Sequence, residues 1–306
     1  MSDTRIQKIT TVVDNRQIAE DIYELVLSGS GLAQASRPGQ FVMLSVADGI
    51  EPFLRRPFSI AGMDKATDTI RIIYQTVGKG TDRMQDWRAG VTVDVLGPLG
   101  NGFSWDDGLE RAILAGGGLG IAAILPLAEA LRVQGIQVDV FLGARSSDML
   151  FGVSELEVFG CCVQVATEDG SSGVSGFVTL PLEEHLRTHL PSVGDGSAGQ
   201  PPGHVSLAAQ HTAAGDPARS QMLFACGPAA FLHAVSDLCA AYQLSGQLSM
   251  EERMGCGFGA CMGCSIEVYS QDAAEERKAD EHQGYRRKRV CKDGPVFPIG
   301  EVVFHG

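Results

Sequence analysis

The chain has 306 residues, of which 44% are hydrophobic and 20% charged, so it is long enough for two or three domains with buried cores. Its 24 basic and 37 acidic residues give a formal net charge of −13. This balance argues against a non-specific binder of nucleic acid or of an anionic membrane, because both need a basic surface. The composition is that of a folded chain, not a disordered one.

The first 108 residues have the pattern of an antiparallel β-barrel. Short strand-like runs alternate with turns of glycine and proline, which is typical of a closed sheet. The predicted strands are Ile22–Leu27, Phe41–Val46, Phe58–Ala61, Ile70–Val77 and Val91–Leu96. We therefore predict a barrel domain over residues 1–108.

From residue 109 onward, predicted strands alternate with predicted helices. The strands are Ala112–Ala115, Val138–Gly143, Cys162–Ala166 and Gln221–Ala225, and the helices are Ile121–Leu131 and Pro228–Tyr242. This alternation favours a doubly wound parallel sheet, so we predict a nucleotide-binding α/β domain over 109–245. Within it, residues 192–220 are rich in small and polar residues and are predicted to form an inserted surface loop.

Two features bear on the cell compartment. The N-terminus has no apolar segment of the kind found in signal peptides, so we expect a cytoplasmic, reducing environment. An uncharged stretch between Arg111 and Glu129 approaches the length of a membrane span. Glycines 116–118 and 120 and Pro126 interrupt it, which favours a strand, a turn and a helix over a membrane helix.

Half of the eight cysteines lie in the last part of the chain, residues 246–306, which we predict to be a small separate domain. Their spacing, C-x4-C-x2-C followed by a distant fourth cysteine, is the plant-type pattern for a [2Fe–2S] cluster. The predicted ligands are Cys256, Cys261, Cys264 and Cys291. Glycines at 255, 257, 259 and 263 allow tight turns and leave amide groups facing the sulfurs. A four-thiolate zinc site and unreactive thiols are the alternatives.

The other cysteines and one charged segment have less specific interpretations. Cys161, Cys162 and Cys239 lie in apolar stretches and are predicted to be buried core residues. Cys226 differs, because it ends a predicted strand. Residues 271–289 are dense in charge and are predicted to be a solvated excursion, with a docking surface for a partner protein as the alternative.

A glycine-rich turn joins the first predicted strand of the α/β domain to its first helix. Such a junction exposes amide groups and a helix N-terminus to which a pyrophosphate can bind, although glycines also serve close packing of a helix on a strand. The spacing does not match G-x-G-x-x-G, which disfavours a plain Rossmann dehydrogenase. The turn comprises Gly116, Gly117, Gly118, Leu119 and Gly120.

A second motif, Arg56-Pro57-Phe58-Ser59, lies in a predicted barrel strand. Strand alternation would place Arg56 and Phe58 on one face and Ser59 on the other. Arginine suits a diphosphate, an aromatic ring suits stacking, and a hydroxyl suits a flavin ring atom. Downstream, Gly78-Lys79-Gly80-Thr81 offers amides, a cation and a hydroxyl to the same diphosphate. Taken singly, each of these motifs is explained better by an edge-strand arginine or by an ordinary glycine turn.

Together, and in this order, the motifs resemble the electron-transfer subunits of class 1B dihydroorotate dehydrogenases, in the ferredoxin–NADP⁺ reductase superfamily. Further matching segments are Gly97–Gly100, Cys226-Gly227-Pro228, Glu251–Cys264 and Cys291–Phe297. The resemblance implies that the barrel binds FAD, the α/β domain binds NAD(H), and the C-terminal segment binds the [2Fe–2S] cluster. The cofactor-binding residues it implies are Arg56, Pro57, Phe58, Ser59, Ile73, Tyr74, Gln75, Gly80, Thr81, Gly116, Gly117, Gly118, Gly120, Gly227 and Pro228.

The resemblance also implies an activity. NADH would reduce FAD, and electrons would pass one at a time through the cluster to a catalytic subunit that contains FMN, or in the reverse direction while dihydroorotate is oxidised in pyrimidine biosynthesis. Two copies of each subunit would form a heterotetramer, with no nucleic acid and no membrane involved.

Two residue roles stay open in this interpretation. Cys226 would lie near the contact between nicotinamide and flavin, although a buried strand-end cysteine explains it equally. A preference for NADH over NADPH follows from the resemblance alone. Arg145-Ser146-Ser147 could meet a 2′-phosphate or could be a plain loop.

Two other functions fit the same residues. One is a related flavin and [2Fe–2S] NAD(P)H reductase subunit that serves a sulfide, ferredoxin or hydrogenase partner. The other, from a different class, is a zinc-stabilised scaffold without enzyme activity. Visible flavin and iron–sulfur absorption bands would separate the two classes.

Overall fold

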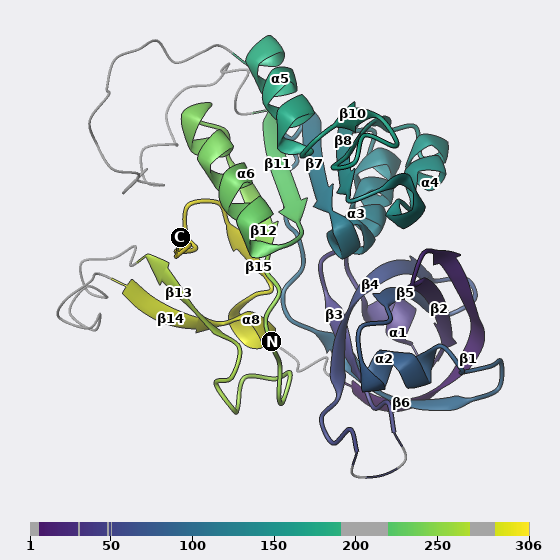
Figure 1. Cartoon of the computed structure of the whole chain (residues 1–306). Helices are drawn as coiled ribbons and strands as arrows, with labels where there is room; N and C mark the ends of the chain where they lie inside the picture. The colour runs from purple at the N-terminus through teal and green to yellow at the C-terminus, as the bar shows by residue number, and fades with distance from the viewer. Residues whose placement is uncertain are drawn as a thin grey trace.

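The computed structural model describes residues 6–29, 31–47, 49, 51–190, 220–269 and 285–305. They form a barrel, a sheet flanked by helices, and a small C-terminal part (Figure 1). Among these residues, no helix combines the length and the hydropathy that a membrane crossing needs. The stretch considered above as a possible span is instead a strand, a glycine turn and a helix.

The N-terminal part is a closed six-stranded antiparallel barrel with the strand order β1-β2-β5-β4-β3-β6, which confirms the predicted barrel. Each predicted strand overlaps an observed one, and β1 is an additional strand. Its interior is filled by aliphatic side chains, including Leu25, Leu27, Val42, Leu44 and Ile72. The elements are β1 (Ile6–Ala19), β2 (Ile22–Ser28), α1 (Leu32–Ala35), β3 (Phe41–Leu44), β4 (Arg56–Asp64), β5 (Thr69–Gln75), α2 (Lys79–Met84) and β6 (Thr92–Leu99).

The second part is a seven-stranded sheet in the order β10-β9-β8-β7-β11-β12-β15. All neighbours are parallel except β12 and β15, which confirms the predicted parallel sheet. The chain runs outward from β7 to β10 and returns to β11 on the other side of β7. The strands are β7 (Arg111–Gly117), β8 (Gln137–Ala144), β9 (Cys162–Thr167), β10 (Val174–Ser175), β11 (Gln221–Cys226), β12 (Gly246–Ser249) and β15 (Val296–Pro298).

Helices cover both faces of this sheet (Figure 1). In β7, Ala112 and Leu114 pack in one buried cluster with α3, whereas Ile113 and Ala115 pack in the other with α5 and α6. This alternation is what a strand buried on both faces requires. The helices are η1 (Gly118–Gly120), α3 (Ile121–Val133), η2 (Ser147–Met149), α4 (Val153–Val158), α5 (Thr179–His189) and α6 (Ala229–Ala241).

The C-terminal part begins at β12, which lies in the large sheet, and returns to that sheet at β15. Between them lie an irregular cysteine-bearing segment (residues 250–264), a two-stranded hairpin of β13 (Ser265–Tyr269) and β14 (Tyr285–Arg289), and the short helix α8 (Val290–Asp293). The sheet of the middle part is therefore completed by strands from the last 61 residues, 246–306.

The predictions for the charged segment and for Cys162 need correction, and the predicted loop insertion lies almost entirely outside the described residues. Residues 285–289 are not a solvated excursion. They form β14, which pairs with β13, and Arg287, Lys288 and Arg289 form ion pairs with Glu267, Glu301 and Asp293, respectively. Cys162 is exposed, not buried, since it stands at the start of β9 with its side chain turned outward, whereas Cys161 and Cys239 are buried as predicted. Residues 191–219, which carry nearly all of the predicted loop insertion, and 270–284 lie outside the described residues.

Candidate redox site

The glycine turn after β7 contains a glycine that close packing requires, Gly120, and another that packing does not explain, Gly118. A β-carbon on Gly120 would lie 2.1 Å from the carbonyl oxygen of Cys226, so α3 can start against β11 only if residue 120 is glycine. Gly118 differs: its φ is +54° and nothing lies within 4 Å of the position of a β-carbon. The open face at Gly118, at the N-terminus of the 13-residue helix α3, is suited to a pyrophosphate.

Cys226 stands beside this turn, in one row with Gly116 on β7 and Ser249 on β12. Its side chain is buried, and burial raises the pKa of the thiol to about 12, with the charge of Glu251 adding to the effect. A thiol with such a pKa is protonated at neutral pH. Cys226 therefore stands at the switch point of the sheet as a neutral thiol.

The flavin motif forms the start of β4. In the register with β3, Phe58 lies opposite Val42 of the barrel interior, and Ser59 lies opposite Phe41 of the neighbouring core, so the predicted alternation of faces is present. The Phe58 ring packs edge to face on Tyr74, with the ring centres 6.1 Å apart.

The glycine-lysine motif contributes the start of α2 beside this strand. A β-carbon on Gly80 would lie 3.3 Å from Nε of Arg56, so the structure brings the two predicted diphosphate-binding segments together. The Thr81 hydroxyl accepts the backbone N–H groups of Val77 (2.9 Å) and Gly78 (3.3 Å). Its observed role is to fix the turn.

The three residues predicted on β5 differ in accessibility. Tyr74 is 1% exposed, and its hydroxyl donates to Oδ1 of Asn15 at 3.1 Å. Ile73 is buried in the core that includes α3. Gln75, at the end of the strand, is half-buried. Tyr74 and Ile73 are therefore buried beneath the flavin strand and not exposed at the site.

The four cysteines of the C-terminal part are drawn together in two pairs. The sulfur of Cys256 accepts hydrogen bonds from the N–H of Ala260 at 3.2 Å and from the N–H of Cys261 at 3.4 Å. The thiols of Cys256 and Cys261 also hydrogen-bond to each other. The sulfur of Cys264 accepts the N–H of Cys291 at 3.4 Å, and the two side chains hydrogen-bond. In the described residues, no group of three or more His, Cys, Asp or Glu side chains is placed to hold a single metal ion.

This pairing tests the two predicted cofactors. A two-iron cluster needs two thiolates on each of two irons, whereas one tetrahedral zinc needs four thiolates around a single point. Backbone N–H groups directed at sulfur are also what iron–sulfur ligands use. The four residues therefore fit a [2Fe–2S] cluster better than zinc.

The thiols of the two pairs differ in acidity. Burial alone would raise the pKa of Cys256, but hydrogen bonds from the backbone of Cys261, Phe258 and Ala260 lower it to about 6. Burial, together with the Cys264 thiol, raises the pKa of Cys291 to about 12. Of these two thiols, Cys256 is the one more readily available as a thiolate, the form that binds metal.

The cysteine segment lies against the barrel. A β-carbon on Gly257 would lie 2.7 Å from Cγ of Met43 and 3.3 Å from Cδ1 of Leu99. Met43 in turn is the cross-strand neighbour of Pro57 in the flavin motif. The predicted flavin strand and the predicted cluster ligands are therefore separated by one layer of side chains.

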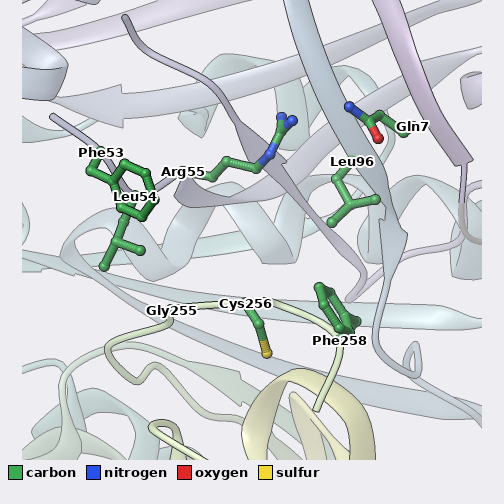
Figure 2. A pocket seen from close by; sticks show the side chains of 8 residues that line it. All are labelled: Gln7, Phe53, Leu54, Arg55, Leu96, Gly255, Cys256 and Phe258. Atoms are coloured by element: carbon green, nitrogen blue, oxygen red, sulfur yellow. The ribbon is translucent and has the colours of Figure 1, made fainter. Parts of the chain in front are cut away.

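A groove of about 480 Å³ opens where these two parts meet (Figure 2). Phe53, Leu54 and Arg55, which lead into β4, lie across from Cys256 and Phe258. Sequence reasoning missed the apolar members of this groove. The available signal was the pair Phe53-Leu54, two large apolar residues directly before a charged motif.

Comparisons with known proteins agree with this arrangement. Residues 251–303 match the family model described as the iron–sulfur cluster binding domain of dihydroorotate dehydrogenase B. A protein of Bacillus cereus (strain Q1), named dihydroorotate dehydrogenase B (NAD(+)), electron transfer subunit, is 35% identical over 294 residues, which cover 95% of this chain and 96% of that protein. A protein of Bacillus anthracis (strain CDC 684 / NRRL 3495) with the same name has the same identity and coverage.

Solved structures extend the comparison to the fold. An NADH-dependent reduced ferredoxin–NADP oxidoreductase, described in the context of flavin-based electron bifurcation, has a TM-score of 0.74 and 26% identity, covering 99% of this chain and 91% of that one. A ferredoxin–NADP⁺ reductase from Neisseria gonorrhoeae with bound FAD and NADP has a TM-score of 0.57 and 16% identity, covering 77% and 91%. The second likeness concerns the fold alone. By its sequence along nearly its whole length, this chain belongs to the family of electron transfer subunits of dihydroorotate dehydrogenase B.

Proposed function

We propose that this chain carries electrons between NAD(H) and a dihydroorotate dehydrogenase catalytic subunit that contains FMN, in pyrimidine biosynthesis. The observation that carries the proposal is the junction at the groove, where the flavin strand and the paired cysteines meet across Met43 and Gly257. Bound FAD and a bound [2Fe–2S] cluster would supply the conversion between hydride transfer and single-electron transfer.

The residues of this chain divide the work of binding. Arg56 and the turn at Gly80 offer a cation and amide groups to the diphosphate of FAD. The open turn at Gly118 offers amide groups to the pyrophosphate of NAD(H). The buried, neutral Cys226 lies at the point where the strand order reverses, which is where a dinucleotide crosses such a sheet.

The four cysteines would hold the cluster in two pairs, Cys256 with Cys261 and Cys264 with Cys291. Since thiols must be reduced to bind iron, we propose a cytoplasmic location. The proposed division of the chain is a FAD-binding part at 1–108, a NAD-binding part at 109–245 and a cluster-binding part at 246–306.

The partner is proposed to dock over the groove and the cysteine segment. Four large apolar side chains are exposed there: Phe53 (81%), Phe258 (43%), Leu54 (47%) and Met262 (51%). Apolar side chains so grouped around a redox group suit a protein interface. A heterotetramer with two copies of each subunit is part of the proposal.

A second candidate, a reductase subunit that serves another redox partner, is favoured by the likeness to the NADH-dependent reduced ferredoxin–NADP oxidoreductase along 99% of this chain. Co-expression with an FMN-containing dihydroorotate dehydrogenase subunit separates the two. We expect a stable complex with flavin and iron–sulfur absorption that forms orotate from dihydroorotate with NAD⁺. An NADH-reducible protein that neither binds nor serves that subunit would favour the second candidate, and a colourless zinc protein would exclude both.

A further inference from the structure

An ion pair between Arg71 of β5 and Glu155 of α4 joins the barrel to the α/β part of the chain. Nη2 of Arg71 donates to Oε1 of Glu155. Between the described residues of 1–108 and those of 109–245, no second ion pair is present. This pair is therefore the charged link between the part proposed to bind FAD and the part proposed to bind NAD(H).

The barrel holds the Arg71 side chain in place independently of Glu155. Nη1 of Arg71 lies 3.3 Å from Oε2 of the buried Glu24. Nη2 also donates to the carbonyl oxygen of Ala61 at 3.1 Å. The guanidinium lies over Gly62, where a β-carbon would stand 2.9 Å from Nε of the arginine. Since these contacts fix the direction of the guanidinium, the barrel presents a preorganised cation to Glu155.

Glu155 completes the charge balance of this network. Glu24 also accepts a hydrogen bond from Nη2 of Arg16 at 2.7 Å, so the barrel alone places two cations beside one carboxylate. Glu155 brings the balance to two cations and two carboxylates. The side chains of Arg71 and Glu155 are 25% and 29% exposed, and a groove of about 300 Å³ opens beside them. The pair is therefore partly shielded from water but within reach of dissolved salt.

On the barrel side, Arg71 shares one face of β5 with a predicted flavin residue. Ile70 and Ile72 lie in the barrel interior, whereas Ile73 packs in the core that contains α3. Because strand residues alternate between faces, Arg71 and Ile73 both face the α/β part. The ion pair is therefore made two residues before Ile73, on the strand that also carries Tyr74 and Gln75.

On the other side, α4 packs tightly on the helix that starts at the glycine turn. A β-carbon on Gly152, directly before α4, would lie 2.8 Å from Cδ2 of Leu125 in α3. The N-terminus of α3 follows Gly118, the open turn proposed for the pyrophosphate of NAD(H). A shift of α4 relative to the barrel would therefore carry the proposed nucleotide site with it.

We infer that Arg71 and Glu155 are positioning residues, which align the nucleotide-binding part of the chain on the flavin-binding part. Hydride transfer needs reacting atoms held about 3–3.5 Å apart, and a misplacement of about 1 Å can slow a reaction about a hundredfold. The inference rests on the proposed function, in which NADH reduces FAD, and extends it to the junction that controls this step.

Glu155→Gln tests the pair in the full chain with its cofactors, because it keeps the shape of the side chain and leaves Glu24 paired with both arginines. In anaerobic stopped-flow at saturating NADH, FAD reduction should be about tenfold slower, the order of a lost hydrogen bond between charged groups. The NADH concentration for half-maximal rate should change less. Added salt should slow the unaltered protein but not the variant. Glu157→Gln, at an exposed position of the same helix, should behave like the unaltered protein.

A readout that needs no turnover is amide hydrogen exchange, measured without NADH. The N–H of Glu20 in the barrel donates to the carbonyl oxygen of Asp148 in the α/β part at 2.9 Å. This amide should exchange faster in Glu155→Gln, by up to the same factor, and at the original rate in Glu157→Gln. Arg71→Gln acts on the same pair, so the double variant Arg71→Gln/Glu155→Gln should reduce FAD no more slowly than Arg71→Gln alone.

An unchanged rate of FAD reduction in Glu155→Gln would overturn the inference, whether or not the variant is less stable. Additive effects of Arg71→Gln and Glu155→Gln would also overturn it, because they would show that the two side chains act separately. Failure of NADH to reduce the FAD of the unaltered protein would count against the proposed function instead.

Discussion

Gly257 of the cysteine segment and Met43 of β3 touch so closely that a β-carbon at residue 257 would lie 2.7 Å from the Met43 side chain. The contact joins parts of the chain more than 200 residues apart. Because Met43 is also the cross-strand neighbour of Pro57, this contact links the flavin strand to the segment that carries the cluster ligands.

Gly257→Ala should therefore disturb the cluster site. The φ of Gly257 is +79°, which costs an alanine about 1 kcal/mol, and the clash with Met43 adds about 1–3 kcal/mol. Gly300→Ala is the matched control, since its φ is +84° but nothing lies within 4 Å. In Gly257→Ala, both the iron content and the free energy of unfolding measured by urea denaturation should fall. Gly300→Ala should show only the smaller loss of stability. Equal behaviour of the two variants would contradict the role of the contact.

The glycine turn offers a similar comparison. A methyl group at residue 120 would meet the backbone of Cys226 at 2.1 Å, and backbone cannot move aside as a side chain can. Gly120→Ala should therefore cost several kcal/mol, on the order of the largest single-residue effects, and abolish NADH binding. Gly118→Ala meets no neighbour and should cost about 1 kcal/mol while weakening NADH binding more than stability. Thermal unfolding and NADH titration, carried out side by side, check both.

Removing one cluster ligand should leave the flavin in place. Cys261→Ser is expected to remove the iron–sulfur absorption and the signal of the reduced cluster in electron paramagnetic resonance, because a two-iron cluster needs all four thiolates. FAD should be retained and still be reduced by NADH, since its candidate residues lie on β4 and α2. Cys162→Ser, at an exposed cysteine, should change neither cofactor. Loss of FAD together with the cluster would show that the two sites fold as one unit.

Alkaline pH should destabilise the protein through its buried thiols. Burial raises the pKa of Cys226 and Cys239 from 9.0 to about 12 in the folded protein. The unfolded chain releases these protons first, so their stabilisation is complete below pH 9 and is lost as the pH rises from about 9 to 12. Each thiol contributes a slope of up to about 1.4 kcal/mol per pH unit.

The measurement is urea denaturation at several values between pH 8 and 10.5. Cys239→Ala, in α6 and outside the redox site, should make the fall in stability shallower by up to the slope of one thiol. A slope in Cys239→Ala identical to that of the unaltered protein would refute the assignment.

The barrel and the parallel sheet could be predicted because their strands are apolar and bounded by glycine. The strand β1 was not predicted because it is largely polar: it alternates exposed residues such as Thr11 and Asp14 with the buried Thr10 and Val12. The strand β14 was taken for a solvated segment because its charges are paired with Glu267, Glu301 and Asp293, and nothing local in the sequence indicates those partners.

The candidate site shows the same limit. The cysteine spacing was sufficient to predict a cluster, since three of the four ligands lie within nine residues of one another, Cys256 to Cys264. The contact of Gly257 with Met43 joins segments that no short motif connects. Sequence motifs therefore identify residues with reactive side chains, whereas the fold determines which of these residues lie close together.

The return of the chain to the large sheet at β15 has a consequence for how this protein can be dissected. The cysteine-bearing segment leaves the sheet after β12 and returns to it at β15, which pairs with β12. Both of its ends are therefore anchored in the large sheet. A protein shortened at residue 250 would lose β15 and leave the backbone of β12 as an open edge, which invites pairing with other chains. The cluster can therefore be removed cleanly by changing its ligands, but not by cutting off the part of the chain that carries them.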